Sequence, residues 1–407
     1  MIPVLGSALI VFSGINGTSF VGNILSLKPM VLIGKISYSL YLWHWPIMVC
    51  GRYFLIRNPA TWEVLLWIAL SILLAFLSWK FIETPFRSKK FLSKPSVYIL
   101  AGSIMALTLA VSLTITYKDG FPQRESLQAG WNSEWKTWRD CQPWDEKNPD
   151  NVEPCSIGAL DQSPNYLLWG DSHAFALASA VNLSSSEADV AGYYVAKSAC
   201  PPLLGIDRVN RMGECVQFNQ AVLDFIKVHP EIKNVVITAR WAISADGSRY
   251  KTESGPTVHL IDWGKNSKEK GTNADLFDIG LKRTVEQIIG LDRKVIIVSS
   301  VPEVGYHVPS AYWIAERTGR DLNQIVAPTV AEYQARNEAV LNTLAKLKKN
   351  YPEIEIIDPA AILCDKSNCL VMDGSTPLYK DDDHLSTSGA FMIAPLFDPS
   401  FTALAER

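Results

Sequence analysis

The stretch Tyr166-Leu-Leu-Trp-Gly170-Asp171-Ser172-His173 is the strongest indication of the fold class. Its first four residues are typical of a short buried strand, and the run Ala174–Leu183 that follows is typical of a helix. A Gly-Asp-Ser turn between strand and helix presents the serine hydroxyl at the rim of a sheet, where free helix N–H groups favour negative charge. The same turn has a second interpretation, in which Ser172 is only a helix N-cap and Asp171 a turn residue.

Short β-branched runs continue to alternate with amphipathic runs on both sides of this stretch. The predicted strands are Tyr166–Trp169, Val190–Val195, Asn234–Thr238, Lys294–Ser299 and Ile354–Ile357, and further helices are predicted at Cys215–Val228, Ile279–Ile289 and Thr329–Lys348. This alternation predicts an α/β domain, a three-layer doubly wound (flavodoxin-like) fold with a parallel sheet covered by helices on both faces. In such folds ligands bind at the carboxyl ends of the strands.

A second polar stretch near the C-terminus is Lys380-Asp381-Asp382-Asp383-His384-Leu385-Ser386. Asp381, three residues before His384, can accept a hydrogen bond from one imidazole nitrogen while the other nitrogen faces a serine. Asp382 and Asp383 are alternatives to Asp381 in that role. The competing interpretation is an acidic loop, with Ser386 as the cap of the next helix in either case.

The chain changes character near residue 117. Residues 1–116 carry nine Lys or Arg and two Asp or Glu, and the rest of the chain carries 29 basic and 39 acidic residues. The first part is therefore +7 and the second −10, which gives the whole chain its net charge of −3. The apolar stretches in front are Met1–Phe12, Met30–Ile56, Trp62–Trp79 and Val97–Thr116. Val97–Thr116 has no charge and is long enough to span a bilayer, whereas Met1–Phe12 is too short. The first stretch lacks basic residues and a cleavage site, which excludes a signal peptide.

The composition also excludes two classes of protein. An apolar fraction of 48% excludes a disordered chain. The mildly acidic second part has no Lys/Arg cluster, which argues against a nucleic-acid partner.

Loop charge and cysteine placement predict that the second part lies outside the cytoplasm. The segment Thr84–Ser96 between two apolar stretches carries four Lys or Arg, so the positive-inside rule places it in the cytoplasm. Six of the seven cysteines follow the last apolar stretch, and their spacing favours the disulfides Cys141–Cys155, Cys200–Cys215 and Cys364–Cys369, with six buried thiols as the alternative. No cysteine group has zinc-site spacing. The predicted organisation is a membrane part over 1–116, a linker over 117–160 and an extracytoplasmic domain over 161–407.

Gly170-Asp171-Ser172 and Asp381-x-x-His384-Leu385 resemble the first and last blocks of the SGNH hydrolases. The resemblance implies that Ser172 is the nucleophile, His384 the general base and Asp381 its partner. The family's two middle blocks supply a Gly and an Asn as oxyanion donors, but Ala239-Arg240-Trp241 stands here where the Asn is expected. The expected donors are therefore the Ser172 N–H, Gly192 and Arg240, although Arg240 has a salt bridge as its alternative role.

The membrane part carries a second resemblance. Gly34–Pro46, with Tyr38, Trp43 and His44, and Phe81–Arg87 are similar to the closing helices of the acyltransferase-3 membrane family, and Ser198-Ala-Cys200-Pro-Pro matches its members that carry a fused SGNH domain. An interfacial aromatic belt and a structural role for His44 are the alternatives. Only the last helices of that family are represented, so Met1 is expected to be an internal start, in a truncated product or a split protein.

The resemblance implies a membrane-anchored O-acyltransferase, with acetyl as the expected acyl group, that modifies a cell-envelope polysaccharide such as lipopolysaccharide O-antigen. It implies a multi-pass protein of the bacterial inner membrane with a periplasmic domain, a glycan acceptor and acyl-coenzyme A as the ultimate donor. The donor is expected through a separate membrane partner, with no bound cofactor or metal. A carbohydrate O-acyl esterase and a truncated non-enzymatic remnant that binds glycans are the two alternatives.

Overall fold

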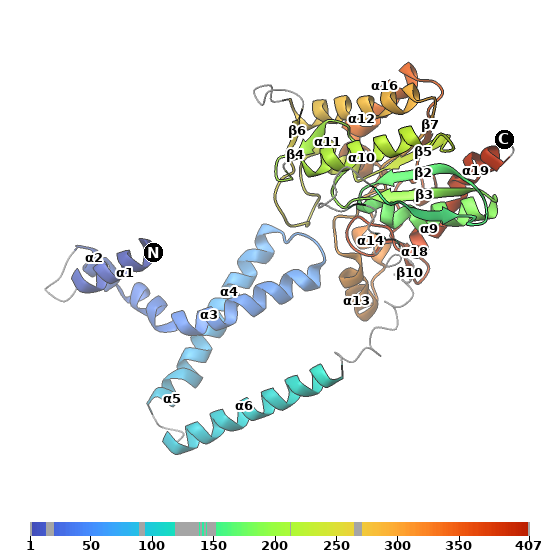
Figure 1. Ribbon diagram of the computed structural model, residues 1–407. Coiled ribbons are helices and arrows are strands. Elements are labelled where there is room, and N and C mark those ends of the chain that lie inside the picture. Colours follow the sequence, from blue (N-terminus) through green and yellow to red (C-terminus); the bar gives the residue numbers. More distant parts are fainter. Residues whose placement is uncertain are drawn as a thin grey trace. The chain divides into compact units, whose positions relative to one another are not determined.

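The computed structural model describes residues 2–13, 20–88, 94–118, 138, 141, 144, 152–211, 213–263 and 271–405. The chain divides into two compact units, Met1–Arg124 and Glu125–Arg407 (Figure 1). The domain limits expected at residues 116 and 161 stay predictions. Most of the predicted linker 117–160 lies outside the described residues.

The first unit is helical. Its elements are α1 (Ile2–Ser13), α2 (Phe20–Leu25), α3 (Lys28–Leu55), α4 (Thr61–Ser78), a π-helical turn (Trp79–Glu83), α5 (Thr84–Arg87) and α6 (Lys94–Tyr117). Helices α3 and α4 pack against each other, and Gly51 permits their close approach. A Cβ at Gly51 would lie 2.6 Å from the Trp67 ring.

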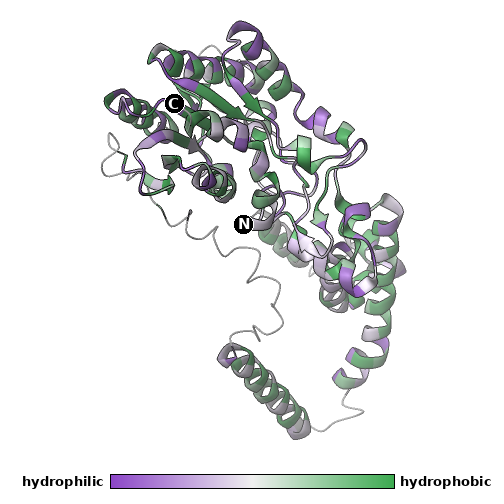
Figure 2. Ribbon diagram, turned by 90° about the vertical axis from the view of Figure 1, so that its right-hand side faces the viewer, coloured by the Kyte–Doolittle hydropathy of each residue, from purple (hydrophilic) through white to green (hydrophobic). Residues whose placement is uncertain are grey.

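Two helical segments of this unit are long and apolar enough to cross a membrane. They are Thr61–Arg87, with 27 residues, and Pro95–Tyr117, with 23 residues. Figure 2 colours most of α6 as hydrophobic, and no residue of its apolar window is buried in this structure. A helix that is apolar on all sides and makes no core suits a lipid environment. The stretch expected at Met30–Ile56 is also a helix, α3, but it is not one of these two apolar spans.

The second unit is built on a six-stranded sheet of order β1-β3-β2-β5-β7-β8. Its strands are β1 (Cys155–Gly158), β2 (Pro164–Gly170), β3 (Ala191–Ala196), β5 (Asn234–Thr238), β7 (Lys294–Val298) and β8 (Glu355–Ile357). Five of them run parallel, and β1 pairs antiparallel with β3. Two small two-stranded sheets join β4 (Ile206–Arg208) to β6 (Leu260–Asp262) and β9 (Met372–Asp373) to β10 (Thr376–Pro377).

Helices cover both faces of the sheet. In Figure 1, α10 (Glu214–Val228), α12 (Asn273–Gly290) and α16 (Glu338–Asn350) lie on one side, and α9 (Ser172–Glu187) and α18 (Thr387–Ile393) on the other. The remaining helices are α11 (Trp241–Asp246), α13 (Val308–Thr318), α14 (Leu322–Val326), α15 (Val330–Arg336), α17 (Ala360–Leu363), a 3₁₀ turn (Ala394–Leu396) and α19 (Asp398–Ala405). The predicted α/β architecture with a sheet between two helical layers is confirmed.

The structure differs from the sequence-based expectation at two places. β1 falls inside the segment predicted as linker and adds an antiparallel edge strand. The helix expected over Thr329–Lys348 is divided into α15 and α16 at Asn337, whose buried side chain donates to the Tyr333 carbonyl (2.9 Å). An asparagine amide that bonds to the main chain competes with the regular helix, which explains the break.

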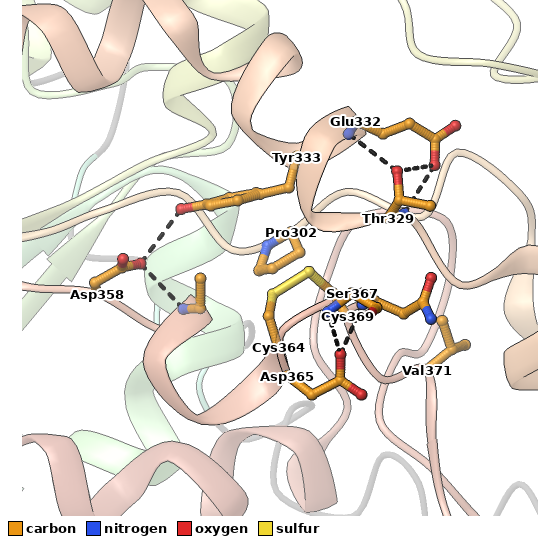
Figure 3. The surroundings of a disulfide bond; sticks show 12 residues. Pro302, Thr329, Glu332, Tyr333, Asp358, Cys364, Asp365, Ser367, Cys369 and Val371 are labelled. Atoms are coloured by element: carbon orange, nitrogen blue, oxygen red, sulfur yellow. Dashed lines mark hydrogen bonds between the residues drawn. A yellow bond between two sulfur atoms is a disulfide. The ribbon is translucent and has the colours of Figure 1, made fainter.

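Three disulfides join sequential cysteines of the second unit: Cys141–Cys155, Cys200–Cys215 and Cys364–Cys369. Figure 3 shows the last of these, where the Asp365 carboxylate accepts the backbone N–H groups of Ser367 and Asn368 (2.6 and 2.8 Å). This closed turn precedes the segment that carries His384. Cys50 of the first unit is a free, exposed thiol.

Candidate active site

Ser172 stands at the carboxyl end of β2 and begins α9. Gly170 is required at this point, because a Cβ there would lie 2.2 Å from the Thr238 carbonyl oxygen of β5. Asp171 is the N-cap of α9, and its buried carboxylate accepts the backbone N–H groups of His173 (2.9 Å) and Arg240 (3.1 Å). The N-cap role considered for Ser172 therefore belongs to Asp171, which leaves the Ser172 hydroxyl available for other contacts.

The loop before α18 brings His384 to Ser172. His384 Nε2 lies 2.8 Å from Ser172 Oγ, although 212 residues separate them in sequence. His384 Nδ1 lies 2.9 Å from Asp381 Oδ2, and the same carboxylate accepts the His384 backbone N–H (2.7 Å). Ser386 caps α18 by accepting the Gly389 N–H (3.1 Å), as expected from the sequence. The serine, imidazole and carboxylate thus form a continuous hydrogen-bonded series.

Asp383 forms a second carboxylate contact with the same imidazole. Its Oδ1 lies 3.0 Å from His384 Nδ1, and its Oδ2 lies 3.0 Å from His173 Nε2 and 2.9 Å from Arg240 Nε. Asp383 and His173 are almost completely buried. Asp383, which the sequence left as an alternative to Asp381, therefore contacts His384 together with Asp381 rather than in place of it.

The carboxylates of Asp381 and Asp383 favour the protonated form of the His384 imidazole. Burial alone would lower the pKa of His384, but the carboxylates of Asp383 and Asp381 outweigh burial and raise that pKa to about 10. Burial likewise opposes ionisation of Asp383, but the neighbouring histidines and Arg240 hold the pKa of its carboxyl well below the usual range. Asp382 makes no such contact, and burial and the adjacent carboxylates raise its pKa to about 6.

A cavity of about 450 Å³ opens beside Ser172 and His384. It is lined by polar and charged side chains together with Ser198 and Ala199 from the turn after β3. Ala199 adopts a left-handed conformation (φ 65°), which turns the chain sharply at the end of the strand. The cavity has the size of a small-ligand site and a more polar wall than most.

The structure places Gly192 and Arg240, the two further residues expected at the oxyanion site, in different surroundings. Gly192 pairs with Tyr166 near the amino end of β3, whereas Gly170 pairs with Ala196 at the carboxyl end. Gly192 is therefore not among the residues that line the cavity, and its missing side chain instead makes room for the Tyr166 ring. Arg240 lines the cavity, but its guanidinium binds Glu253 through both terminal nitrogens (2.9 and 2.8 Å) and Glu303 through Nε (2.8 Å). Arg240 thus forms the salt bridges that the sequence left as its alternative role.

Sequence reasoning missed two residues of this region. His173 follows Ser172 directly, but only the fold shows that it reaches Asp383. Arg208, at the end of β4, lines the cavity although nothing in its local sequence indicates a site. One potential ligand atom from each of His173, Asp383 and His384 lies within 4.8 Å of the others, and the same is true of Asp381–Asp383, so either group has the spacing of a metal site. In the first group, His173 Nε2 and His384 Nδ1 contact carboxylates, and His384 Nε2 contacts the Ser172 hydroxyl.

Comparison with known proteins gives a family match over this unit. Residues 140–399 match the family model described as "SGNH domain (fused to AT3 domains)".

Individual relatives match shorter regions. The O-acetyltransferase OatA of Staphylococcus aureus is 41% identical over 83 residues, which are 20% of this chain and 14% of OatA. The peptidoglycan O-acetyltransferase OatA of Listeria monocytogenes is 41% identical over 76 residues, 18% of this chain and 12% of that protein. Each match thus spans 14% or less of the relative's length. The periplasmic domain of a Salmonella ser. Paratyphi A lipopolysaccharide acetyltransferase is 17% identical, covers 60% of this chain and 85% of that domain, and superposes with a TM-score of 0.44.

Proposed function

Because the chain belongs to the family of SGNH domains that are fused to AT3 domains, we propose that it is a membrane-anchored O-acyltransferase in which Ser172 passes an acyl group to a cell-envelope glycan. The proposed acyl group is acetyl, since the matched relatives are named O-acetyltransferases. The observation that carries the proposal is the 2.8 Å contact between Ser172 Oγ and His384 Nε2.

In the first half-reaction Ser172 Oγ attacks the carbonyl carbon of the acyl donor while His384 Nε2 accepts the hydroxyl proton. The bond between that carbon and the donor's leaving atom then breaks, and His384 returns the proton to the leaving group. The product is an acyl ester on Ser172. The carbonyl oxygen becomes negative at the amino end of α9, where the Ser172 backbone N–H is the proposed donor.

In the second half-reaction a sugar hydroxyl attacks the acyl-Ser172 ester. His384 Nε2 takes the proton of that hydroxyl, the bond from the acyl carbon to Ser172 Oγ breaks, and the proton passes to Oγ. Asp381 and Asp383 stabilise the imidazolium from the side of Nδ1 during both halves, and they fix which nitrogen faces Ser172.

The proposed location is the bacterial inner membrane, crossed more than once, with the second unit in the periplasm. The two apolar spans, the basic segment Thr84–Ser96 between them and the three disulfides of the second unit support this location. The proposed ultimate donor is acyl-coenzyme A, with the acyl group delivered by a separate membrane partner.

The test uses the full chain in detergent with 4-nitrophenyl acetate as donor and a soluble oligosaccharide as acceptor, and mass spectrometry counts acetyl groups on the sugar. We expect transfer by the native chain and none by Ser172→Ala. Ser186→Ala, on the same helix but about four turns further on, is the matched control and should behave as the native chain. Transfer that persists in Ser172→Ala would contradict the proposal. Release of acetate without sugar acetylation would support the esterase instead, and failure of Ser172 to acylate would support the non-enzymatic remnant.

A further inference from the structure

Arg208 is fixed at the wall of the cavity by the backbone around it. It ends β4, where it pairs with Leu260 of β6. Its own N–H donates to the Asp207 carboxylate (2.7 Å), which also accepts the Gly213 N–H. The disulfide Cys200–Cys215 encloses this segment and ties it to the turn that holds Ala199. Arg208 therefore projects from a rigid support.

The Arg208 guanidinium forms no salt bridge with any residue that the structure describes, although the Asp171 carboxylate is close enough to act on its charge. Arg208 is 9% exposed, and its Nε is buried without a hydrogen-bond partner among the described residues. Burial lowers the pKa of Arg208 to about 10, although the Asp171 carboxylate partly opposes that shift, so the group keeps its charge at neutral pH. A buried charge is costly unless something pairs with it.

The neighbouring arginines differ from Arg208 in this respect. Arg240 binds Glu253 and Glu303, and Arg249 binds Glu253. The carboxylates of the cavity are occupied as well, because Glu253 holds Arg240, Asp171 holds backbone N–H groups, and Asp381 and Asp383 hold His384. The fifth carboxylate of the cavity, that of Asp382, forms no ion pair with Arg208 in the described structure. The cavity thus presents one free buried cation beside Ser172 among the residues that the structure describes.

We propose that Arg208 binds an anionic substituent, a carboxylate or a phosphate, on the sugar that occupies the cavity next to Ser172. The proposal rests on the proposed function, because it names the substrate class of that same site. A planar guanidinium matches either anion through paired N–H donors. The polar cavity of about 450 Å³ has room for one sugar residue beside the acyl ester. Arg208 therefore selects acidic over neutral sugars.

Binding is measured first, and it does not depend on turnover. The full chain with Ser172→Ala is titrated by calorimetry with glucuronic acid, glucose 6-phosphate and glucose. We expect one or both acidic sugars to bind at least tenfold more tightly than glucose, and Arg208→Gln to remove that difference. The stronger of the two acidic probes identifies the anion. Equal binding of all three sugars, or an acidic preference that survives Arg208→Gln, would overturn the proposal.

Kinetic measurements then distinguish two roles for Arg208. It could bind the anionic group of the sugar, or it could stabilise the oxyanion that forms on the acyl group during transfer. With neutral 4-nitrophenyl acetate, we expect Arg208→Gln to acylate Ser172 within about threefold of the native rate, while KM for the acidic acceptor rises at least tenfold. A loss of about 10²–10³ in the acylation rate would assign Arg208 to the oxyanion and contradict the proposal.

Two further variants serve as controls: one tests whether loss of any cation in this segment has the same effect, and the other tests the positive charge at position 208. Arg211→Gln removes a cation from the same segment, one that pairs with Glu214 (2.9 Å) and is not among the residues lining the cavity, so acidic preference should survive in it. Arg208→Lys should restore part of the preference, because it keeps the charge without the paired donors. Arg208→Gln should be at least as stable to heat as the native chain. If no variant transfers acetyl groups but Arg208→Gln still abolishes acidic binding, the proposed function fails and the binding site stands.

Discussion

The rings of His173 and His384 lie 4.6 Å apart between centroids with their planes tilted by 37°, and Asp383 contacts both rings, one through each carboxylate oxygen. One histidine follows Ser172 in sequence and the other faces its hydroxyl from the far end of the chain. Through Asp383, the helix that carries Ser172 also fixes the loop that carries His384. This connection makes the Ser172–His384 distance a property of the fold rather than of one flexible loop.

His173 should therefore act as a positioning residue. His173→Gln loses the contact with Asp383, and we expect a fall in the rate of Ser172 acylation on the order of 10- to 100-fold, because small misplacements of reacting groups are costly. The pH profile should change along with the rate, which a merely structural defect would not produce. His307→Gln, at an exposed position, is the control. An unchanged profile and rate in His173→Gln would remove His173 from the account.

The pH dependence follows from the two carboxylates on His384. His384 cannot accept the Ser172 proton while it is itself protonated, so the acylation rate should rise with pH through the raised pKa of His384. Asp383→Asn removes one negative charge, which lowers that pKa and moves the acid limb to lower pH, by about one unit or more. Stopped-flow acylation across pH measures this shift. Asp373→Asn, at the exposed position of β9, should leave the acid limb of the pH profile unchanged. A limb that moves to higher pH in Asp383→Asn would contradict the assignment.

Arg240 should matter to stability as much as to activity. Its guanidinium is nearly buried among Glu253, Glu303 and Asp383. Arg240→Gln leaves these carboxylates with less compensation, and removal of one partner from a buried ion pair costs about 3–5 kcal/mol. Denaturant unfolding of the full chain should show this loss, with Arg211→Gln as a surface control. A loss within about 0.5 kcal/mol would show that the network does not support the fold.

Each disulfide should contribute to the free energy of unfolding according to the number of residues that it encloses. Cys200–Cys215 closes a separation of 15 residues and Cys364–Cys369 one of 5. Loop-closure entropy then gives about 3 kcal/mol for the first and roughly 1 kcal/mol less for the second. Paired Cys→Ser variants, compared by denaturant unfolding, test this order. Loss of Cys200–Cys215 should also weaken acidic-sugar binding, because that bond supports the Arg208 segment.

The sequence was sufficient for the features that depend on local pattern. Asn234–Thr238 is a strand with the predicted bounds, since a short β-branched run next to helical periodicity has few other solutions. Ser172, Asp381 and His384 could be proposed as a group because a strand-to-helix turn and an Asp-x-x-His spacing can be read from the sequence, and the structure brings the three side chains together. Asp383 remained one of three acidic neighbours, because only the bend of the loop decides which carboxylates reach the imidazole.

Features that depend on distant packing could not be predicted in this way. Gly192 was proposed for the oxyanion site, but its place in β3 is explained by contact with the Tyr166 ring. Arg208 gave no signal, because its significance is the absence of a partner, which depends on every residue packed around it. The break at Asn337 arises from one buried amide in an otherwise regular helical pattern.

The most direct test of the central claim is mass spectrometry of the full chain after brief exposure to 4-nitrophenyl acetate. We expect one acetyl group on the peptide that contains Ser172, and much slower labelling in His384→Ala, because His384 Nε2, which lies 2.8 Å from Ser172 Oγ, is the proposed base. An unlabelled Ser172, or labelling at the native rate in His384→Ala, would contradict it.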